Sequence, residues 1–244
     1  MEKHPVVLVG GGPGAWDLIT VRGMHALQAA DVILADHLGP TSELEKLCDV
    51  NSKEVIDCSK LPYGKQVAQE RINAMLVEHA LAGKKVVRLK GGDSFVFGRG
   101  FEEIKACVAA GLTYEVVPGV TSAISVPAVF GVPVTQRGVV HSFTVISGHV
   151  PPGHPTSLNN WSALAQTGGT LVVIMGVKNG AVIASALIDA GRPGDTPVAV
   201  IQEGTTASQT GFRTTLESLS ADLLTHEVKP PAVIVIGEVA GLEV

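Results

Sequence analysis

A strand, a glycine turn and a helix follow one another directly between residues 86 and 110, and this order strongly constrains the fold. Residues 86–90 read Val-Val-Arg-Leu-Lys, and the apolar, partly β-branched positions are typical of a packed strand. Gly91, Gly92 and Asp93 follow without a linker, and glycine allows close approach of the backbone because it has no Cβ. Open α/β sheets bind ligands at such loops. We expect an α/β protein with a ligand site here, and a plain strand-to-helix turn is the alternative.

The same alternation of strand and helix recurs along most of the chain. Its length of 244 residues allows one large domain or two small ones. We expect strands at 5–10, 31–36, 53–57, 86–90, 113–117, 142–147, 170–175, 197–202, 209–213 and 232–236. We expect helices at 17–30, 65–81, 101–110, 122–129, 180–190 and 215–225.

The charge and cysteine content exclude several classes of protein. The net charge of −5 gives no general attraction to nucleic acid or to an anionic membrane surface. There is no run of about 18 apolar residues, so no membrane span is expected, and residues 1–5 lack a signal-peptide pattern. Cys48, Cys58 and Cys107 are odd in number and form no Cys-x-x-Cys pair. This suggests reduced thiols and a cytoplasmic location.

The first glycine loop admits a different function. Gly10, Gly12 and Ala15 satisfy the G-x-G-x-x-G/A pattern of dinucleotide-binding loops, and Asp36 lies near the distance expected for a ribose-binding acid. Pro13 weakens this interpretation because it removes an N–H group that would face a pyrophosphate. An NAD-dependent oxidoreductase therefore remains an alternative from another class.

Residues 91–103 read GGDSFVFGRGFEE and resemble the GGDxFVFGRGxEE hallmark of the tetrapyrrole methylases. The resemblance covers nearly the whole chain and is strongest to the uroporphyrinogen-III C-methyltransferases. It implies the tetrapyrrole methylase fold, with two α/β domains, 1–118 and 119–244, and a cofactor and substrate cleft between them. It also implies methyl transfer from S-adenosylmethionine to uroporphyrinogen III, which gives precorrin-2 and S-adenosylhomocysteine in sirohaem and cobalamin biosynthesis. The family is typically dimeric, so a homodimer is expected.

The resemblance also implies the cofactor-binding residues. They belong to the GxGPG loop that contains Gly10, the hallmark segment, the PGxTSA segment that begins at Pro118, and the carboxyl ends of later strands. The residues carried over from these segments are Pro13, Gly91, Gly92, Asp93, Val96, Thr121, Ser122, Met175, Gly204 and Ala232.

Two residues are candidates for proton chemistry. The family usually has Asp-Arg-Leu where this chain has Asp36-His37-Leu38, and its Asp is assigned as the proton acceptor. Lys60 matches the family's proton donor, with an uncertainty of one residue in a loop that is longer by one. The alternatives are that Asp36 caps a helix that begins near Thr41 and that Lys60 is a solvated charge.

The substrate implied by the resemblance carries eight carboxylates, which an acidic protein must meet with local cations. Arg88, Arg99 and Arg137 lie at motif ends and are the candidates, because guanidinium groups form forked hydrogen bonds with carboxylates. No metal site is expected, since the spacing of the histidines fits no common ligand set.

Four departures from the family pattern leave the acceptor open. Ala15, His37, Ser94 and Gln136 replace the usual Asp, Arg, Pro and His. A methylase for a later precorrin or for a diphthamide precursor, and a non-catalytic ligand-binding module, are further alternatives.

Overall fold

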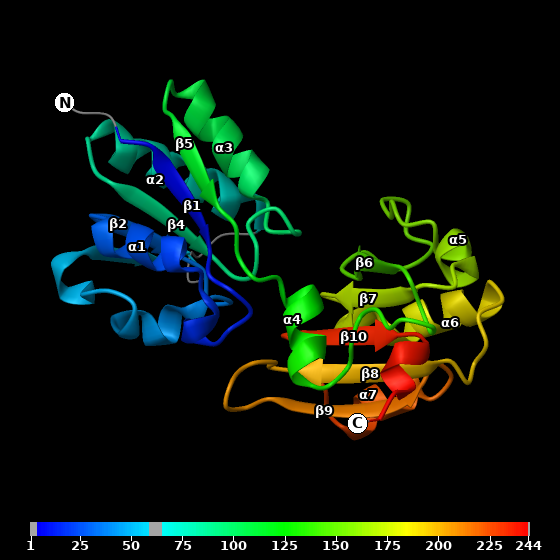
Figure 1. Cartoon of the computed structure of the whole chain (residues 1–244). Helices are drawn as coiled ribbons and strands as arrows, with labels where there is room; N and C mark the ends of the chain where they lie inside the picture. The colour runs from blue at the N-terminus through cyan, green and yellow to red at the C-terminus, as the bar shows by residue number, and fades with distance from the viewer. Residues whose placement is uncertain (1–3, 59–64, 244) are drawn as a thin grey trace. The chain divides into compact units, whose positions relative to one another are not determined.

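The computed structural model describes residues 4–58 and 65–243, with side chains at all of these positions except 65–68 (Figure 1). The chain divides into two compact units, residues 1–121 and 122–244. The boundary expected from the sequence, at Pro118, falls before this division because Gly119 packs against Gly10 and Gly92 of the first unit.

The first unit contains a five-stranded sheet in which every strand pair is parallel, with the order β3-β2-β4-β1-β5. The strands are β1 (Val6–Gly10), β2 (Val32–Ala35), β3 (Glu54–Asp57), β4 (Val86–Lys90) and β5 (Tyr114–Val117). In this register Arg88 of β4 lies opposite Leu34 of β2. Because parallel strands end at the same edge, the loops after β1, β2, β4 and β5 lie along one edge of the sheet.

Helices cover both faces of this sheet (Figure 1). Leu8 of β1 belongs to a hydrophobic cluster shared with α2 (Lys65–Leu81) and α3 (Gly100–Ala109). Val9, the next residue, belongs to a second cluster shared with α1 (Val21–Ala29). Successive side chains of a strand point to opposite faces, so both faces must be apolar. All five residues of β4 are buried for this reason.

The second unit contains a mixed five-stranded sheet in the order β6-β7-β10-β8-β9. The strands are β6 (Phe143–Ser147), β7 (Thr170–Ile174), β8 (Pro197–Gln202), β9 (Thr210–Thr215) and β10 (Ala232–Ile236). β10 is antiparallel to both β7 and β8, so the last residues of β7 and β8 lie beside the first residues of β10.

The second sheet is also covered on both faces. Val200 of β8 packs in a cluster shared with α5 (Trp161–Gln166), α6 (Gly180–Asp189) and α7 (Leu219–Thr225). Ile201, the next residue, packs on the opposite face in a cluster shared with α4 (Ser122–Val129).

Two helices begin later than expected, and one helix is not expected. α1 begins at Val21 instead of residue 17 because the hydroxyl of Thr20 accepts the N–H of Gly23, at 3.1 Å, and caps the helix there. α7 begins at Leu219 because residues up to 215 are paired with β8. α5 is not expected from the sequence, since six residues are too few for a recognisable helical period.

All three thiols are free and buried. Burial raises the pKa of Cys48, and it raises the pKa of Cys58 and Cys107 to about 11. None of the described helices is long and apolar enough to cross a membrane. Within the described ranges, no group of three or more His, Cys, Asp or Glu residues is arranged to hold a metal ion.

Candidate active site

Three glycines bring the ends of β1, β4 and β5 into direct backbone contact. A Cβ on Gly119 would lie 2.2 Å from the carbonyl oxygen of Gly92 and 2.6 Å from the Cα of Gly10, so no larger residue fits without a shift of backbone. The N–H of Gly92 also donates to the carbonyl of Gly12 at 2.6 Å. The predicted cofactor residues Gly91 and Gly92 therefore lie at a junction of three loops.

The side chain of Asp93 joins the loops after β4 and β5 through hydrogen bonds. Its Oδ1 accepts the N–H of Phe95 at 2.8 Å, and its Oδ2 accepts the N–H of Gly119 at 3.0 Å. The sequence treats Asp93 as an acceptor for a ligand, whereas the structure gives each of its oxygens a backbone donor. Val96 also belongs to this turn, since its N–H donates to the carbonyl of Asp93 at 3.2 Å. Asp93 thus has a role in the fold, whatever it contributes to binding.

The loop after this turn holds two residues in the left-handed region. Phe97 has φ 56° and Arg99 has φ 58°, which is uncommon for residues other than glycine and is often found at functional sites. Arg99 forms a forked pair with Glu102, with Nε–Oε1 and Nη2–Oε2 distances of 2.8 and 2.7 Å. Hydrogen bonding to Arg99 lowers the pKa of Glu102. The side chain of Arg99 is 45% exposed and is therefore accessible to a ligand.

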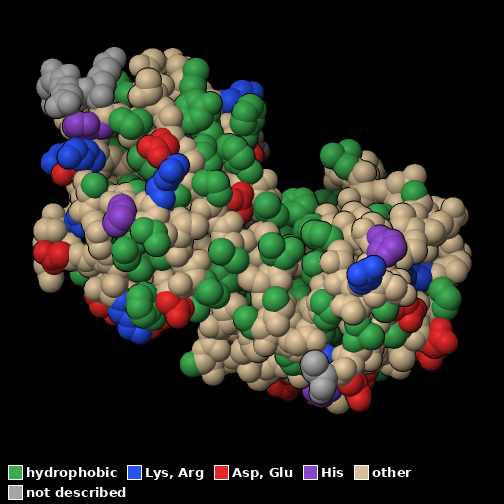
Figure 2. All heavy atoms as spheres, in the orientation of Figure 1, with side chains coloured by type: hydrophobic (Ala, Val, Ile, Leu, Met, Phe, Trp, Pro, Cys, Tyr) green, Lys and Arg blue, Asp and Glu red, His purple; other side chains and the backbone are tan. Residues whose placement is uncertain are grey.

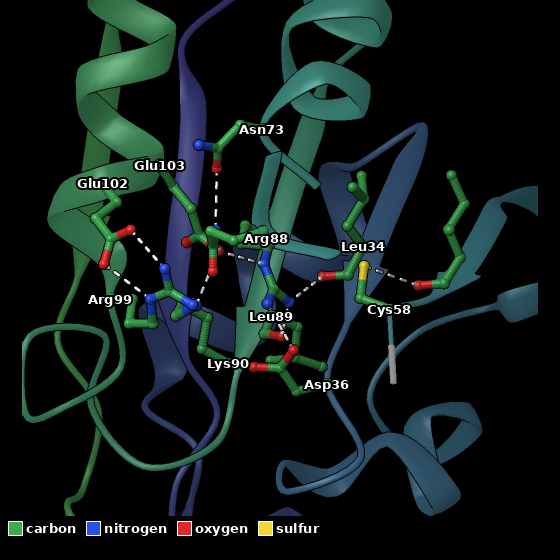
Figure 3. A network of polar contacts seen from close by, with 12 residues as sticks. Leu34, Asp36, Cys58, Asn73, Arg88, Leu89, Lys90, Arg99, Glu102 and Glu103 are labelled. Atoms are coloured by element: carbon green, nitrogen blue, oxygen red, sulfur yellow. Dashed lines mark hydrogen bonds and ion pairs between the residues drawn. The ribbon is translucent and has the colours of Figure 1, made fainter. Parts of the chain in front are cut away.

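Arg88 is the centre of a polar network inside the first unit (Figure 3). Its Nε donates to Glu103 of α3 at 3.0 Å, and its Nη2 donates to Asp36 at 2.5 Å. Its Nη1 donates to the carbonyls of Leu34 and Leu89 at 3.2 and 2.9 Å. These contacts join β2, β4 and α3.

This environment argues against the predicted contact between Arg88 and the substrate. The side chain is only 2% exposed, and each of its three nitrogens already donates to an acceptor of this chain. Burial therefore leaves a substrate carboxylate little access to this guanidinium group. Arg88 therefore stays out of the proposed substrate-binding set.

Glu103 is fully buried and receives three donors on one oxygen. Its Oε1 accepts from Arg88, from the ammonium group of Lys90 at 2.9 Å and from the amide of Gln69 at 3.3 Å. Its Oε2 has no hydrogen-bond partner within the described part of the chain. Burial, and then the charge of Arg88, lower the pKa of Lys90. The cluster of Asp36, Arg88, Lys90 and Glu103 thus contains two cations and two carboxyl groups.

Asp36 follows β2 and lies at the end of this network. Its side chain is 28% exposed, and its Oδ1 pairs with Arg88. Among the described residues, its Oδ2 has no hydrogen-bond partner. The hydroxyl of Thr41 donates to the main-chain carbonyl of Asp36, not to the carboxylate. The alternative that the Asp36 side chain caps the following segment is therefore wrong.

The remaining predicted residues outside the second sheet edge are Pro13, Thr121, Lys60 and Arg137. Pro13 follows β1 in the loop bridged to Gly92, and Thr121 ends the segment after β5; both are half-buried. Lys60 lies outside the described residues. Arg137, in the second unit, is exposed in the turn between Gln136 and Val140.

In the second unit, three predicted cofactor residues come together at one edge of the sheet. Met175 follows β7 and Gly204 follows β8, while Ala232 begins β10. Ala232 lies opposite Gln202, and its neighbour Val233 lies opposite Ile174. The antiparallel register of β10 therefore produces this meeting point.

The backbone at this edge is unusual. Met175, Glu203 and Thr205 have φ values of 56°, 50° and 72°, and the side chain of Met175 is 48% exposed. A Cβ on Gly204 would lie 2.4 Å from Val126 of α4, so glycine allows α4 to pack directly on the loop after β8. Ser122, another predicted residue, is half-buried at the start of α4.

Several residues of these two edges are not identified from the sequence. Gly148 and Gly176 pack against each other after β6 and β7, since a Cβ on Gly148 would lie 2.6 Å from the Cα of Gly176. Glu103 stands in the hallmark segment, but its role is not apparent there. Two cations in an apolar strand, Arg88 and Lys90, were the available signal that a buried carboxylate must face them.

The surface charges offer no broad basic region on the face shown in Figure 2, where basic and acidic side chains are interspersed over both units. A polyanionic ligand that approaches this face would meet individual cations and not a basic patch.

The chain matches the family described as Tetrapyrrole (Corrin/Porphyrin) Methylases over residues 5–220. It is 43% identical over 237 residues to the S-adenosyl-L-methionine-dependent uroporphyrinogen III methyltransferase of Methanosarcina barkeri, which covers 97% of this chain and 92% of that protein. It is 44% identical to the siroheme synthase of Pseudomonas paraeruginosa, covering 99% of this chain but 51% of that protein. The chain thus spans about half the length of several curated relatives.

A solved structure of similar fold was determined with a bound small molecule. The uroporphyrin-III C-methyl transferase of Thermus thermophilus, complexed with S-adenyl homocysteine, has a TM-score of 0.80 and 35% identity, over 98% of this chain and 99% of that chain. This likeness confirms the predicted fold class, and the comparisons give no support to the NAD-dependent alternative. The chain belongs to the tetrapyrrole (corrin/porphyrin) methylases.

Proposed function

We propose that this chain is an S-adenosylmethionine-dependent C-methyltransferase that converts uroporphyrinogen III to precorrin-2. The observation that carries the proposal is the similarity to the Methanosarcina barkeri methyltransferase, which extends over nearly the full length of both chains. The likeness to a structure complexed with S-adenyl homocysteine supports the choice of methyl donor. Sirohaem and cobalamin biosynthesis are the routes that use such a product.

The two sheet edges supply the proposed cofactor residues. Those of the first unit are Pro13, Gly91, Gly92, Asp93, Val96 and Thr121, and those of the second are Ser122, Met175, Gly204 and Ala232. Met175 is about half exposed and suits contact with an apolar or adenosyl surface, because Met side chains are soft and adaptable. Glycine at Gly91, Gly92 and Gly204 leaves no Cβ that would keep a ligand away from the backbone.

When bound, S-adenosylmethionine supplies an electrophilic methyl group, and its sulfur keeps the electron pair of the broken S–C bond. Methyl transfer requires the donor sulfur, the methyl group and the acceptor carbon to lie in line, and the bound donor and acceptor contribute to the rate through proximity and orientation. Asp36 accepts, at Oδ2, the proton that the pyrrole nitrogen loses as the new C–C bond forms. Lys60 is the proposed proton donor. Arg99 and Arg137 bind the substrate carboxylates, since both are exposed cations.

Turnover of uroporphyrinogen III with S-adenosylmethionine, under anaerobic conditions, tests this function. We expect precorrin-2 and two equivalents of S-adenosylhomocysteine, because two ring positions are methylated. If the protein binds S-adenosylhomocysteine but leaves uroporphyrinogen III unchanged, the acceptor is wrong, and a later precorrin becomes the next substrate to test.

The substitution Asp36→Asn tests the proposed base. It keeps the shape of the side chain and leaves an oxygen for Arg88, so the fold and the affinity for S-adenosylhomocysteine should be retained. Methyl transfer should fall by at least about tenfold and up to about 10⁴-fold, since this is the usual contribution of a general base. Ordinary activity of Asp36→Asn would remove Asp36 from the catalytic role.

We also propose that the protein is a cytoplasmic homodimer. Three free, buried thiols suit a reducing compartment. Light scattering after gel filtration gives the oligomeric state directly, and a mass equal to one chain of 25.2 kDa contradicts the dimer.

A further inference from the structure

Two cations, Arg88 and Lys90, lie in β4, a strand of the first unit that is buried at every residue, and both contact the same carboxylate, Glu103. A buried ion pair is a weak source of stability, because desolvation of the charges offsets much of their attraction. Aliphatic residues alone usually form a strand that is buried on both faces of a parallel sheet. Stability of the sheet alone therefore does not explain why these charged residues are present.

The hydrogen bonds of Arg88 fix the orientation of its guanidinium group. Glu103 holds Nε, and the carbonyls of Leu34 and Leu89 hold Nη1, so three acceptors that belong to the fold fix the plane of the guanidinium group. Nη2 then points to the Oδ1 atom of Asp36 (Figure 3). The planar fork of arginine allows this arrangement because its nitrogens point in fixed, separate directions, whereas a lysine presents a single compact charge.

This orientation gives the two carboxylate oxygens of Asp36 different hydrogen bonding. Oδ1 is held by a group that cannot move without breaking the contacts to Glu103 and to two strands. Oδ2 has no partner among the described residues, and the Asp36 side chain is 28% exposed. One oxygen is thus anchored while the other is available.

We propose that Arg88 is a positioning residue for Asp36 and that Glu103 in turn positions Arg88. The chain Glu103–Arg88–Asp36 fixes the carboxylate so that Oδ2 faces the reacting proton. Lys90 balances the second negative charge, which lets Glu103 remain buried next to Arg88. The catalytic consequence rests on the function proposed above, whereas the placement of Asp36 by Arg88 does not.

A purely structural ion pair predicts different behaviour. If Arg88 serves stability alone, its replacement lowers the fraction of folded protein and leaves the rate per folded molecule unchanged. If it positions Asp36, its replacement lowers kcat, and this loss vanishes once Asp36 can no longer act as a base. A double-mutant cycle separates these two cases.

The cycle uses Arg88→Lys, Asp36→Asn and the double variant. Arg88→Lys keeps the charge and removes the fork. Glu78→Gln, which removes a charge from an exposed pair with Arg71, is the matched control for loss of an ion pair. Circular dichroism and S-adenosylhomocysteine affinity show that each variant is folded, and single-turnover kinetics then give the rate of methyl transfer per folded molecule.

We expect Arg88→Lys to lower kcat by about tenfold or more while the KM for S-adenosylmethionine stays unchanged. The double variant should be no slower than Asp36→Asn alone, and Glu78→Gln should match the wild type. Losses that multiply in the double variant, or a wild-type rate for Arg88→Lys, would overturn the proposal.

A second variant and a crystal structure test the positioning role if Arg88→Lys does not fold or if the wild type is inactive. If Arg88→Lys does not fold, Glu103→Gln, which keeps the shape of Glu103, takes its place in the same cycle with the same expectation. A crystal structure of either variant should show the Asp36 carboxylate displaced, even if the wild type does not methylate uroporphyrinogen III. An unmoved carboxylate contradicts the positioning role, whereas an inactive wild type contradicts only the proposed function.

Discussion

At the scale of single residues, buried charges distinguish this protein from an ordinary α/β sheet. Glu103 has no exposed surface and is joined to two cations on β4, so each partner depends on the others for charge compensation. Next to it on the same helix, Glu102 is about half exposed and pairs with Arg99 at the surface. The two glutamates allow a direct comparison of a buried and an exposed ion pair.

Replacing Glu103 with leucine should lower the free energy of unfolding by about 3–5 kcal/mol, since it leaves Arg88 and Lys90 buried without their common partner. The same change at Glu102 should cost less than about 1 kcal/mol, because water replaces the exposed partner. Urea denaturation of both variants measures the difference. Equal losses would show that burial of the network is not energetically important.

The thiol of Cys107 gives a prediction for alkaline pH. Burial raises its pKa from 9.0 to about 11, so the folded state holds the proton more tightly than the unfolded state does. The resulting stability is fully present below about pH 9 and is lost as the pH rises towards about 11. The loss should be on the order of 2 kcal/mol for this thiol.

The difference between wild type and Cys107→Ala isolates this effect. The small cavity left by alanine costs the same at every pH, whereas the thiol contribution changes only between about pH 9 and 11. Lys90, whose pKa is lowered by burial, acts in the opposite direction and cancels in the comparison. The stability gap between the two proteins should therefore narrow as the pH rises, as urea titrations at several pH values can test, and a constant gap would contradict the raised pKa.

At the scale of elements, the loops after the parallel strands of the first unit connect strands to the segments that follow and also contact one another. The loops after β1, β4 and β5 contact one another through Gly10, Gly92 and Gly119, and Asp93 ties two of them together. The main chain of the site is thus built from three separate strand ends. It does not depend on any one loop alone.

The substitution Gly119→Ala should disrupt this junction. Its Cβ would lie 2.2 Å from the Gly92 carbonyl, which is backbone and cannot rotate away, so a cost of about 1–3 kcal/mol is expected from overpacking. Gly168→Ala is the matched control because nothing lies within 4 Å of its Cβ. Thermal unfolding of the two variants gives the comparison. Equal midpoints would mean that the three loops can separate at little cost.

At the scale of the whole molecule, binding of the proposed product should stabilise the fold. At a concentration of 100 times Kd, S-adenosylhomocysteine contributes about 2.7 kcal/mol, which corresponds to a rise in Tm of roughly 5–10 °C for a chain of this size. NADH at the same concentration should leave Tm unchanged. Differential scanning fluorimetry measures both. A shift with NADH alone would restore the oxidoreductase alternative.

The sequence by itself determined the class of fold and the position of the candidate site along the chain. The apolar strands, the glycine turns after them and the hallmark segment 91–103 are local patterns, and local patterns report strands, turns and their order. The ten strands expected from these patterns all occur, with small shifts at their ends. The tetrapyrrole methylase resemblance followed from the same short segments.

Only the tertiary structure decided what the charged residues do. Arg88 and Asp36 are 52 positions apart, and Asp93 and Gly119 are 26 apart, so no local periodicity reports that they meet. An arginine at the end of a strand motif suggests an exposed cation, yet the parallel pairing of β2 with β4 and the packing of α3 enclose it. Register and packing are properties of the assembled sheet, and for this reason the sequence identified Asp36 but not the residues that hold it.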